Sequence, residues 1–185
     1  MEISGFSYKA AGVLGGTFDP IHLGHLRLGW EACSCLSLSK LFIVPCHIPP
    51  HRQEPRASVQ HRLNMAHIAC KNTPEFEVAD WETKNTGPSY SVKTLSHFRD
   101  QLGADLPLIF IMGTDAFNGL SHWHQWQDIL SLAHLWIAHR PRASLPAANT
   151  EESHLLNTRQ VRKASDLLNS PAGNIFLYNT TALDI

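Results

Sequence analysis

The sequence lacks several features that would point to other classes of protein. It has no basic excess: the formal net charge is −1 at pH 7, which argues against a nucleic-acid-binding protein. Its most apolar run, residues 106–112, is interrupted by Pro107 and is too short to span a membrane. The N-terminus, MEISGFSYKA, has neither a charged region nor a long apolar core. We therefore expect no signal peptide, no membrane association and a cytoplasmic location.

Metal and nucleotide fingerprints of the common kinds are also missing. The four cysteines include Cys33 and Cys35 in a C-x-C pair, which is not a zinc spacing, and we expect reduced thiols. The twelve histidines lack partner ligands at fixed spacing, and no HExxH occurs, so we predict no metal held by the protein itself. There is no G-x-G-x-x-G, and no Lys follows the early glycines as it does in a P-loop.

What the sequence does contain is an alternation of short apolar runs and helix-like segments. It predicts strands at residues 10–15, 40–45, 75–79, 106–112, 134–139 and 174–178, and helices at 24–36, 58–70, 89–102, 126–132 and 151–169. This alternation predicts an α/β fold with a doubly wound parallel sheet, in a single domain over residues 1–185. Such sheets bind ligands at the carboxyl ends of their strands, which here are Gly15, Pro45, Gly113 and His139.

The stretch GGTFDPIHLGHL, residues 15–26, joins the first predicted strand to the first predicted helix. Gly15 and Gly16 allow close approach of a ligand and backbone angles that other residues avoid. The N–H groups at a helix N-terminus favour an anion such as phosphate. His22 and His25 share one face of the first turn and can donate to phosphate oxygens, more strongly when protonated. The stretch predicts a phosphate cradle, and the alternative is a tight turn with two surface histidines.

The same string resembles the GxFDPxHxGH signature of the nucleotidyltransferase superfamily, whose fold is the adenylyltransferase type of Rossmann-like fold. Three further segments, PCHIPPHR (45–52), GPSYSVKTL (87–95) and MGTDAFNGLSHWHQW (112–126), resemble those of bacterial nicotinate-mononucleotide adenylyltransferases. The resemblance implies adenylyl transfer from ATP to nicotinate mononucleotide in NAD biosynthesis. The products would be nicotinate adenine dinucleotide and pyrophosphate. The positions that match the signature are Gly16, Phe18, Asp19, Pro20, His22, Gly24 and His25.

The resemblance also implies site residues and a mechanism. The phosphate of nicotinate mononucleotide would attack the α-phosphorus of ATP directly, with Mg²⁺ bridging the phosphates and with His22 and His25 as catalytic residues. The residues implied for ATP are Gly15, Gly16, Thr17, Phe18, His22, His25, Gly113 and Asp115. Those implied for nicotinate mononucleotide are Cys46, Arg52, Tyr90, Ser91, Trp123 and His124.

The residue types of three of these positions suit such roles, and each has a plainer alternative. Trp123 offers a flat face to a pyridine ring but could be a core aromatic. Arg52 could pair with a phosphate or be a solvated loop residue. Asp115 could bind a ribose hydroxyl, cap the following helix, or do both.

Two departures from the family and two rival functions remain open. Lys93 stands where relatives commonly have an acidic residue, and we expect it to be exposed on a helix. Ile185 stands where relatives begin a Ser/Thr-rich turn with an Ile-Arg. We therefore expect a C-terminal end that is truncated or divergent, or whose remainder lies beyond this sequence. The rivals are adenylyl transfer to another acceptor, pantetheine phosphate, and a non-catalytic nucleotide-binding protein. The oligomeric state stays open.

Overall fold

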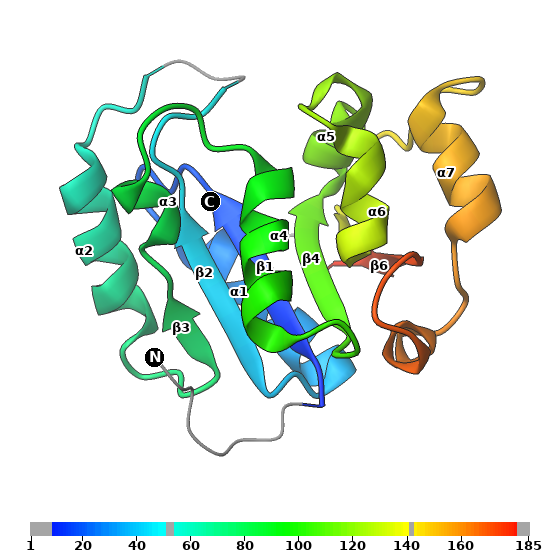
Figure 1. The fold of residues 1–185 in the computed structure, drawn as a ribbon, viewed down its shortest axis with the longest axis horizontal. Coiled ribbons are helices and arrows are strands. Elements are labelled where there is room, and N and C mark those ends of the chain that lie inside the picture. The colour runs from blue at the N-terminus through cyan, green and yellow to red at the C-terminus, as the bar shows by residue number, and fades with distance from the viewer. Residues whose placement is uncertain (1–8, 51–53, 141–142, 181–185) are drawn as a thin grey trace.

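A computed structural model of the chain describes residues 9–50, 54–140 and 143–180, and their strands form one parallel sheet. The strand order is β3-β2-β1-β4-β5-β6, with every neighbouring pair parallel (Figure 1). This is the doubly wound α/β fold that the sequence predicts. The strands are β1 Ala11–Gly16, β2 Lys40–Pro45, β3 Phe76–Val78, β4 Leu108–Gly113, β5 His134–His139 and β6 Ile175–Asn179.

The six predicted strands all form, and two of them, β2 and β5, have the predicted ends. The fourth begins later than predicted, at Leu108, because Pro107 has no N–H group for a sheet ladder. The carbonyl of Pro107 instead accepts a hydrogen bond of 3.0 Å from the N–H of Ala11. Sequence periodicity therefore located all six strands, with ends that differ by one or two residues in four of them.

Helices cover both faces of the sheet. Along β1 and β4, Val13 and Phe110 belong to one buried cluster, and Leu14 and Ile111 belong to the other. Helix α4 packs on the first face and α1 on the second, in front of and behind the sheet in Figure 1. The α-helices are α1 Leu23–Leu36, α2 Val59–Cys70, α3 Trp81–Lys84, α4 Ser91–Leu102, α5 Thr114–Phe117, α6 Ile129–Leu132 and α7 Glu151–Arg159. The 3-10 helices are η1 Leu120–His122, η2 Trp126–Asp128 and η3 Ala164–Asn169.

The segment 151–169 differs from the prediction of one polar helix. Helix α7 ends at Arg159, and Gln160 then pairs with Ile175 in an isolated parallel bridge. The N–H of Val161 donates to the carbonyl of Ile175 at 2.8 Å. The chain leaves the helix there because these bonds satisfy the open edge of β6. Helices α3, α5 and η1 were not predicted, and among the described residues no helix could cross a membrane.

The sheet opens where its strand order reverses direction. β1 pairs with β2 as far as Gly16 opposite Pro45, and β4 pairs with β5 as far as Gly113 opposite Ala138. Between β1 and β4, however, the last pair is Leu14 opposite Ile111. The carboxyl ends of the two central strands therefore part, at the position where doubly wound sheets bind their ligands.

Helix α2 begins at a serine cap, which gives a first test of the fold. The Oγ of Ser58 accepts from the N–H of His61 at 3.3 Å. Ser58→Ala removes this acceptor and should lower the free energy of unfolding by about 1 kcal/mol. Urea titration followed by circular dichroism measures it. Ser34→Ala, at an exposed position inside α1, is the matched control and should not lower stability.

Candidate functional site

The turn after β1 is shaped by a buried aromatic ring. Phe18 is 2% exposed and has a left-handed backbone with φ of 49°. A Cβ atom on Gly16 would lie 2.8 Å from the Phe18 ring, so no larger residue fits there without a shift. The φ values of Gly15 and Gly16 are not in the left-handed region, unlike those of three later glycines. The sequence analysis was therefore wrong about their backbone angles, and the close approach at Gly16 is to Phe18.

Both histidines of the signature are fixed by backbone hydrogen bonds at the start of α1. His22 is the N-cap residue, and its Nδ1 accepts from the N–H of Gly24 at 3.2 Å. The Nδ1 of His25 accepts from the N–H of His22 at 3.3 Å. The two rings lie 3.8 Å apart between centroids, and the edge of the His25 ring meets Phe18 at 5.0 Å. The structure thus confirms that His22 and His25 share one face.

These bonds determine which ring nitrogen carries the proton. A backbone N–H can only donate, so Nδ1 of His22 and of His25 must present a lone pair. Each neutral imidazole therefore carries its hydrogen on Nε2. A second proton on either ring would displace a bond of the helix cap.

The loop after β2 lies against the turn after β1. The N–H of Cys46 donates to the carbonyl of Gly16 at 2.9 Å, and its Sγ lies 3.8 Å from Oγ1 of Thr17. Burial raises the pKa of the Cys46 thiol, which keeps it neutral. The predicted site residues Thr17 and Cys46 therefore meet. Arg52, also predicted from this loop, lies outside the described residues.

A buried arginine ties the two loops together. Arg62 of α2 is 1% exposed, and its Nη1 donates to the carbonyl of Thr17 at 2.6 Å. Its Nη2 donates to the carbonyl of His47 at 3.1 Å, and its Nε to that of Ala57 at 3.3 Å. The sequence analysis did not identify Arg62. Its spacing from Ala66 and Cys70, the other buried residues of α2, places it on the inner face and was the available signal.

The other side of His47 is held by the segment before α4. The N–H of His47 donates to Oγ of Ser89 at 2.9 Å, and the N–H of Ser89 donates to the carbonyl of Ile48 at 2.9 Å. The buried carboxyl group of Glu82 accepts hydrogen bonds from Ser89 and from Thr94. Burial raises the pKa of Glu82, although these two bonds lower it in part. The sequence analysis missed Glu82, and it included Ser89 only as part of the segment 87–95 without assigning it a role.

Aromatic rings gather at the start of α4. The rings of Tyr90, the N-cap of α4, and His124 lie 4.3 Å apart. Ser91 is the first residue of the helix, where backbone N–H groups lack helical partners. Trp123 is half-buried and meets Phe110 edge to face at 6.3 Å. The structure therefore brings Tyr90 and His124 together, with Trp123 next to His124 in the chain.

The end of β4 carries the remaining predicted residues. Gly113 is the N-cap of α5, so Asp115 does not cap that helix and instead lies exposed in its first turn. Oγ1 of Thr114 donates to the carbonyl of Ala138 at 3.0 Å and lies 3.3 Å from Nδ1 of His139. These bonds join the carboxyl ends of β4 and β5. Lys93, as predicted, is exposed on a helix, with its Nζ 5.6 Å from the Tyr90 ring centre.

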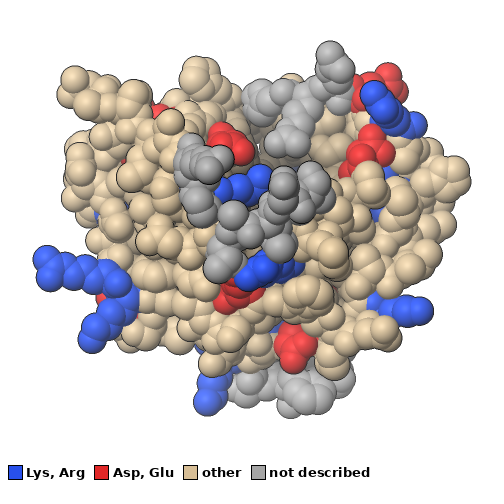
Figure 2. Space-filling model, turned by 180° about the vertical axis from the view of Figure 1, so that it is seen from behind, with Lys and Arg blue, Asp and Glu red and all other residues tan. Residues whose placement is uncertain are grey.

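The protein shows no extended patch of one charge in Figure 2, and its described residues form no set of metal ligands. In Figure 2, which shows the back of the molecule, basic and acidic residues are scattered and no large area of one sign stands out. Among the described residues, no group of three or more His, Cys, Asp or Glu is placed to hold a metal ion. The donors at the site are imidazole and backbone N–H groups, which suit phosphate oxygens.

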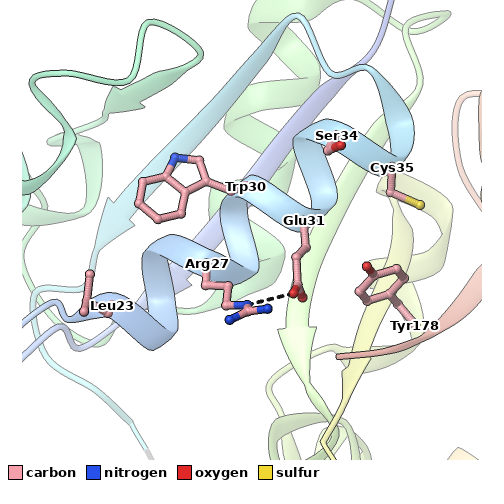
Figure 3. A pocket seen from close by; sticks show the side chains of 7 residues that line it. All are labelled: Leu23, Arg27, Trp30, Glu31, Ser34, Cys35 and Tyr178. Atoms are coloured by element: carbon pink, nitrogen blue, oxygen red, sulfur yellow. Dashed lines mark hydrogen bonds and ion pairs between the residues drawn. The ribbon is translucent and has the colours of Figure 1, made fainter. Parts of the chain in front are cut away.

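The surface has two notable grooves, and we ask whether either contains the predicted site residues. One of 680 Å³ runs along the outer face of α1, where Nε of Arg27 pairs with Glu31 at 2.9 Å (Figure 3). It contains no predicted site residue, so we do not assign it as the site. A second groove, of 530 Å³, lies at the loop between β2 and α2 and is lined in part by His47 and Arg62.

Comparisons with known proteins agree with this geometry. The model of the cytidylyltransferase-like family matches residues 13–166. A protein of Marinobacter nauticus described as a probable nicotinate-nucleotide adenylyltransferase is 42% identical over 173 residues, which cover 94% of this chain and 80% of that protein. A protein of Yersinia pestis with the same description is 36% identical over 185 residues, covering 100% and 84%.

Solved structures support the fold. The nicotinic acid mononucleotide adenylyltransferase of Plasmodium falciparum, complexed with NaAD, matches with a TM-score of 0.69 and 16% identity. The match covers 95% of this chain and 77% of that chain. At this identity the likeness establishes the architecture alone.

The tautomer of the histidine pair can be measured directly. The bonds from Gly24 and His22 predict that the neutral forms of the His22 and His25 rings are Nε2–H tautomers. Nitrogen-15 NMR of the ring nitrogens should show Nδ1 without a proton on both residues. A protonated Nδ1 on either residue would contradict the cap. His67, exposed on α2, is the reference for a solvated histidine.

Proposed function

The chain belongs to the cytidylyltransferase-like family, and from this premise we propose that it is a nicotinate-nucleotide adenylyltransferase. It transfers the adenylyl group of ATP to nicotinate mononucleotide in NAD biosynthesis and releases pyrophosphate. The observation that carries this assignment is the 42% identity, over 94% of the chain, to a protein described with that activity. The Nε2–H groups held at the start of α1 supply the phosphate donors that the reaction needs.

On the ATP side, we propose that the turn after β1 and the start of α1 hold the phosphates. Gly15 and Gly16 present backbone at the open end of the sheet, beside the positive end of a 14-residue helix. Phe18 and Thr17 complete the turn, and Phe18 supports the ring of His25. Gly113 and Asp115 lie at the end of β4, across the parted strands, where Asp115 suits a ribose hydroxyl.

On the mononucleotide side, we propose that the nicotinate ring and its carboxylate lie near the start of α4. The half-buried Trp123 provides a face for the ring, while Tyr90 and His124 form the adjoining wall. Backbone N–H groups at Ser91 and His124 suit a carboxylate, and they should bind a neutral amide more weakly because it lacks the full charge. Cys46 lines the same end of β2, and Arg52 is assigned to the mononucleotide phosphate.

The reaction needs little from the protein beyond position and charge stabilisation. A phosphate oxygen of nicotinate mononucleotide forms a bond to the α-phosphorus of ATP as the bond to the pyrophosphate oxygen breaks. The nucleophile is already an anion, so no general base is required. His22 and His25 donate from Nε2 to oxygens on which negative charge grows, and the helix cap keeps both rings in place.

Mg²⁺ fits this site as an ion carried by its substrate. Mg²⁺ prefers oxygen ligands, keeps several waters and is commonly bound through phosphates. The described residues offer no carboxylate cluster, and we assign no side chain as its ligand. When bound, the ion neutralises charge on the phosphates, while the residues above orient them. We also propose a cytoplasmic location, because the four cysteines are free thiols.

Product formation is the direct test of this function. The full chain is mixed with Mg²⁺, ATP and nicotinate mononucleotide, and the dinucleotides are separated by chromatography. We expect nicotinate adenine dinucleotide and pyrophosphate, and much less product from the amide analogue. Product from pantetheine phosphate instead would favour the other acceptor. ATP binding without any product would favour a non-catalytic protein.

A substitution at His22 separates catalysis from folding. His22→Asn retains an N-cap acceptor but loses the Nε2–H donor. We expect kcat to fall roughly 10²–10³-fold, as for loss of one preorganised donor. The free energy of unfolding should stay near that of the wild type. His22→Ala, which loses both functions, should lower kcat and stability together, and equal stability losses in the two variants would count against this division.

A further inference from the structure

Arg62 is deeply buried and forms no ion pair with an acidic residue among those that the structure describes. Its guanidinium donates to the backbone carbonyls of Thr17, His47 and Ala57. The ion pairs found among the described residues join Arg27 to Glu31, Lys40 to Glu77 and Lys84 to Asp80, and none involves Arg62. Burying a cation is costly unless it is hydrogen-bonded, and here three backbone carbonyls accept from the guanidinium.

The backbone of His47 is held from both sides. Arg62 binds its carbonyl at 3.1 Å, and Ser89 accepts from its N–H at 2.9 Å. Ser89 in turn donates to the buried carboxyl group of Glu82. A continuous polar chain therefore runs from Glu82 through Ser89 and His47 to Arg62, and from Arg62 to Thr17.

This series of hydrogen bonds connects the two halves of the substrate site assigned above. Thr17 belongs to the turn proposed for ATP, and Ser89 directly precedes Tyr90 at the place proposed for nicotinate mononucleotide. The isolated parallel bridge between Ile48 and Pro88 adds a further link between the loop after β2 and this segment. One residue, Arg62, thus reaches both halves through backbone carbonyls.

We propose that Arg62 is a positioning residue for both substrates, acting through the carbonyls of Thr17 and His47 together with the Ser89–Glu82 pair. Its hydrogen bonds fix the relative position of the two loops. This inference rests on the proposed function for the identity of the two ligands. The hydrogen bonds of Arg62 themselves are observed among the described residues and do not depend on that function.

The chain offers a matched control for a merely structural arginine. Arg99 of α4 likewise donates to backbone carbonyls, including those of Leu132 at 2.5 Å and Leu106 at 2.6 Å. It joins segments next to the amino ends of β4 and β5, whereas the site lies at the carboxyl ends of the strands. Removing its guanidinium should therefore weaken the fold without altering the site.

The experiment measures binding and turnover in five full-length proteins: the wild type, Arg62→Met, Arg62→Lys, Ser89→Ala and Arg99→Met. Calorimetry gives the Kd for nicotinate mononucleotide, and for a non-hydrolysable ATP analogue with Mg²⁺. Arg62→Met should raise the Kd for both ligands roughly tenfold or more, the effect expected for loss of charged hydrogen bonds. Arg62→Lys, which keeps the charge but not the planar fork, should weaken them less. Ser89→Ala should weaken the mononucleotide more than the ATP analogue.

Arg99→Met should lower the melting temperature yet keep both Kd values within about twofold of the wild type. Wild-type affinity in Arg62→Met, or an equal loss of affinity in Arg99→Met, would overturn the proposal. If Arg62→Met does not fold, Arg62→Lys and Ser89→Ala decide it by the same criterion. A wild type that binds both ligands but forms no dinucleotide defeats the proposed function alone. A wild type that binds neither ligand overturns both.

Discussion

The contact between Phe18 and Gly16 is the constraint on which the site depends. Because the Phe18 ring occupies the space above Gly16, the chain must turn directly after β1, with Phe18 in a left-handed conformation. This turn delivers His22 to the N-cap of α1 and places the edge of His25 against the same ring. The turn and the position of the His25 ring both depend on this one buried aromatic side chain. A glycine that looked like a source of backbone freedom is required here for want of space.

Much of the architecture could be predicted from the sequence, because buried parallel strands are short apolar runs that stand out from their surroundings. Periodicity could not predict the end of α7 at Arg159, because what ends that helix is a bridge to Ile175 that is remote in sequence. Nor could it predict α5, whose four residues are too few to show a helical repeat. In both cases the decisive interaction is tertiary.

The site divides in the same way. His22 and His25 could be identified because their spacing and neighbours form a recognisable string, although the tautomer required the hydrogen bonds to Nδ1. Arg62 and Glu82 were not recognised as site residues, since charged residues inside helical segments usually face solvent. Burial reverses that expectation only once the neighbouring loops are in place. The spacing of Arg62 from Ala66 and Cys70 did indicate the inner face of α2. The roles of Asp115 and Trp123 stay predictions, and Arg52 lies beyond the described residues.

The parting of β1 and β4 has a mechanical meaning as well. Strands β1 to β3 and strands β4 to β6 form two halves of the sheet, and between them the ladder stops at Leu14 and Ile111. ATP, proposed to bind at the ends of both β1 and β4, would span the part where these two strands are not paired. By this proposal, a bound substrate would link the two halves of the sheet, and its binding would stiffen the sheet near its centre.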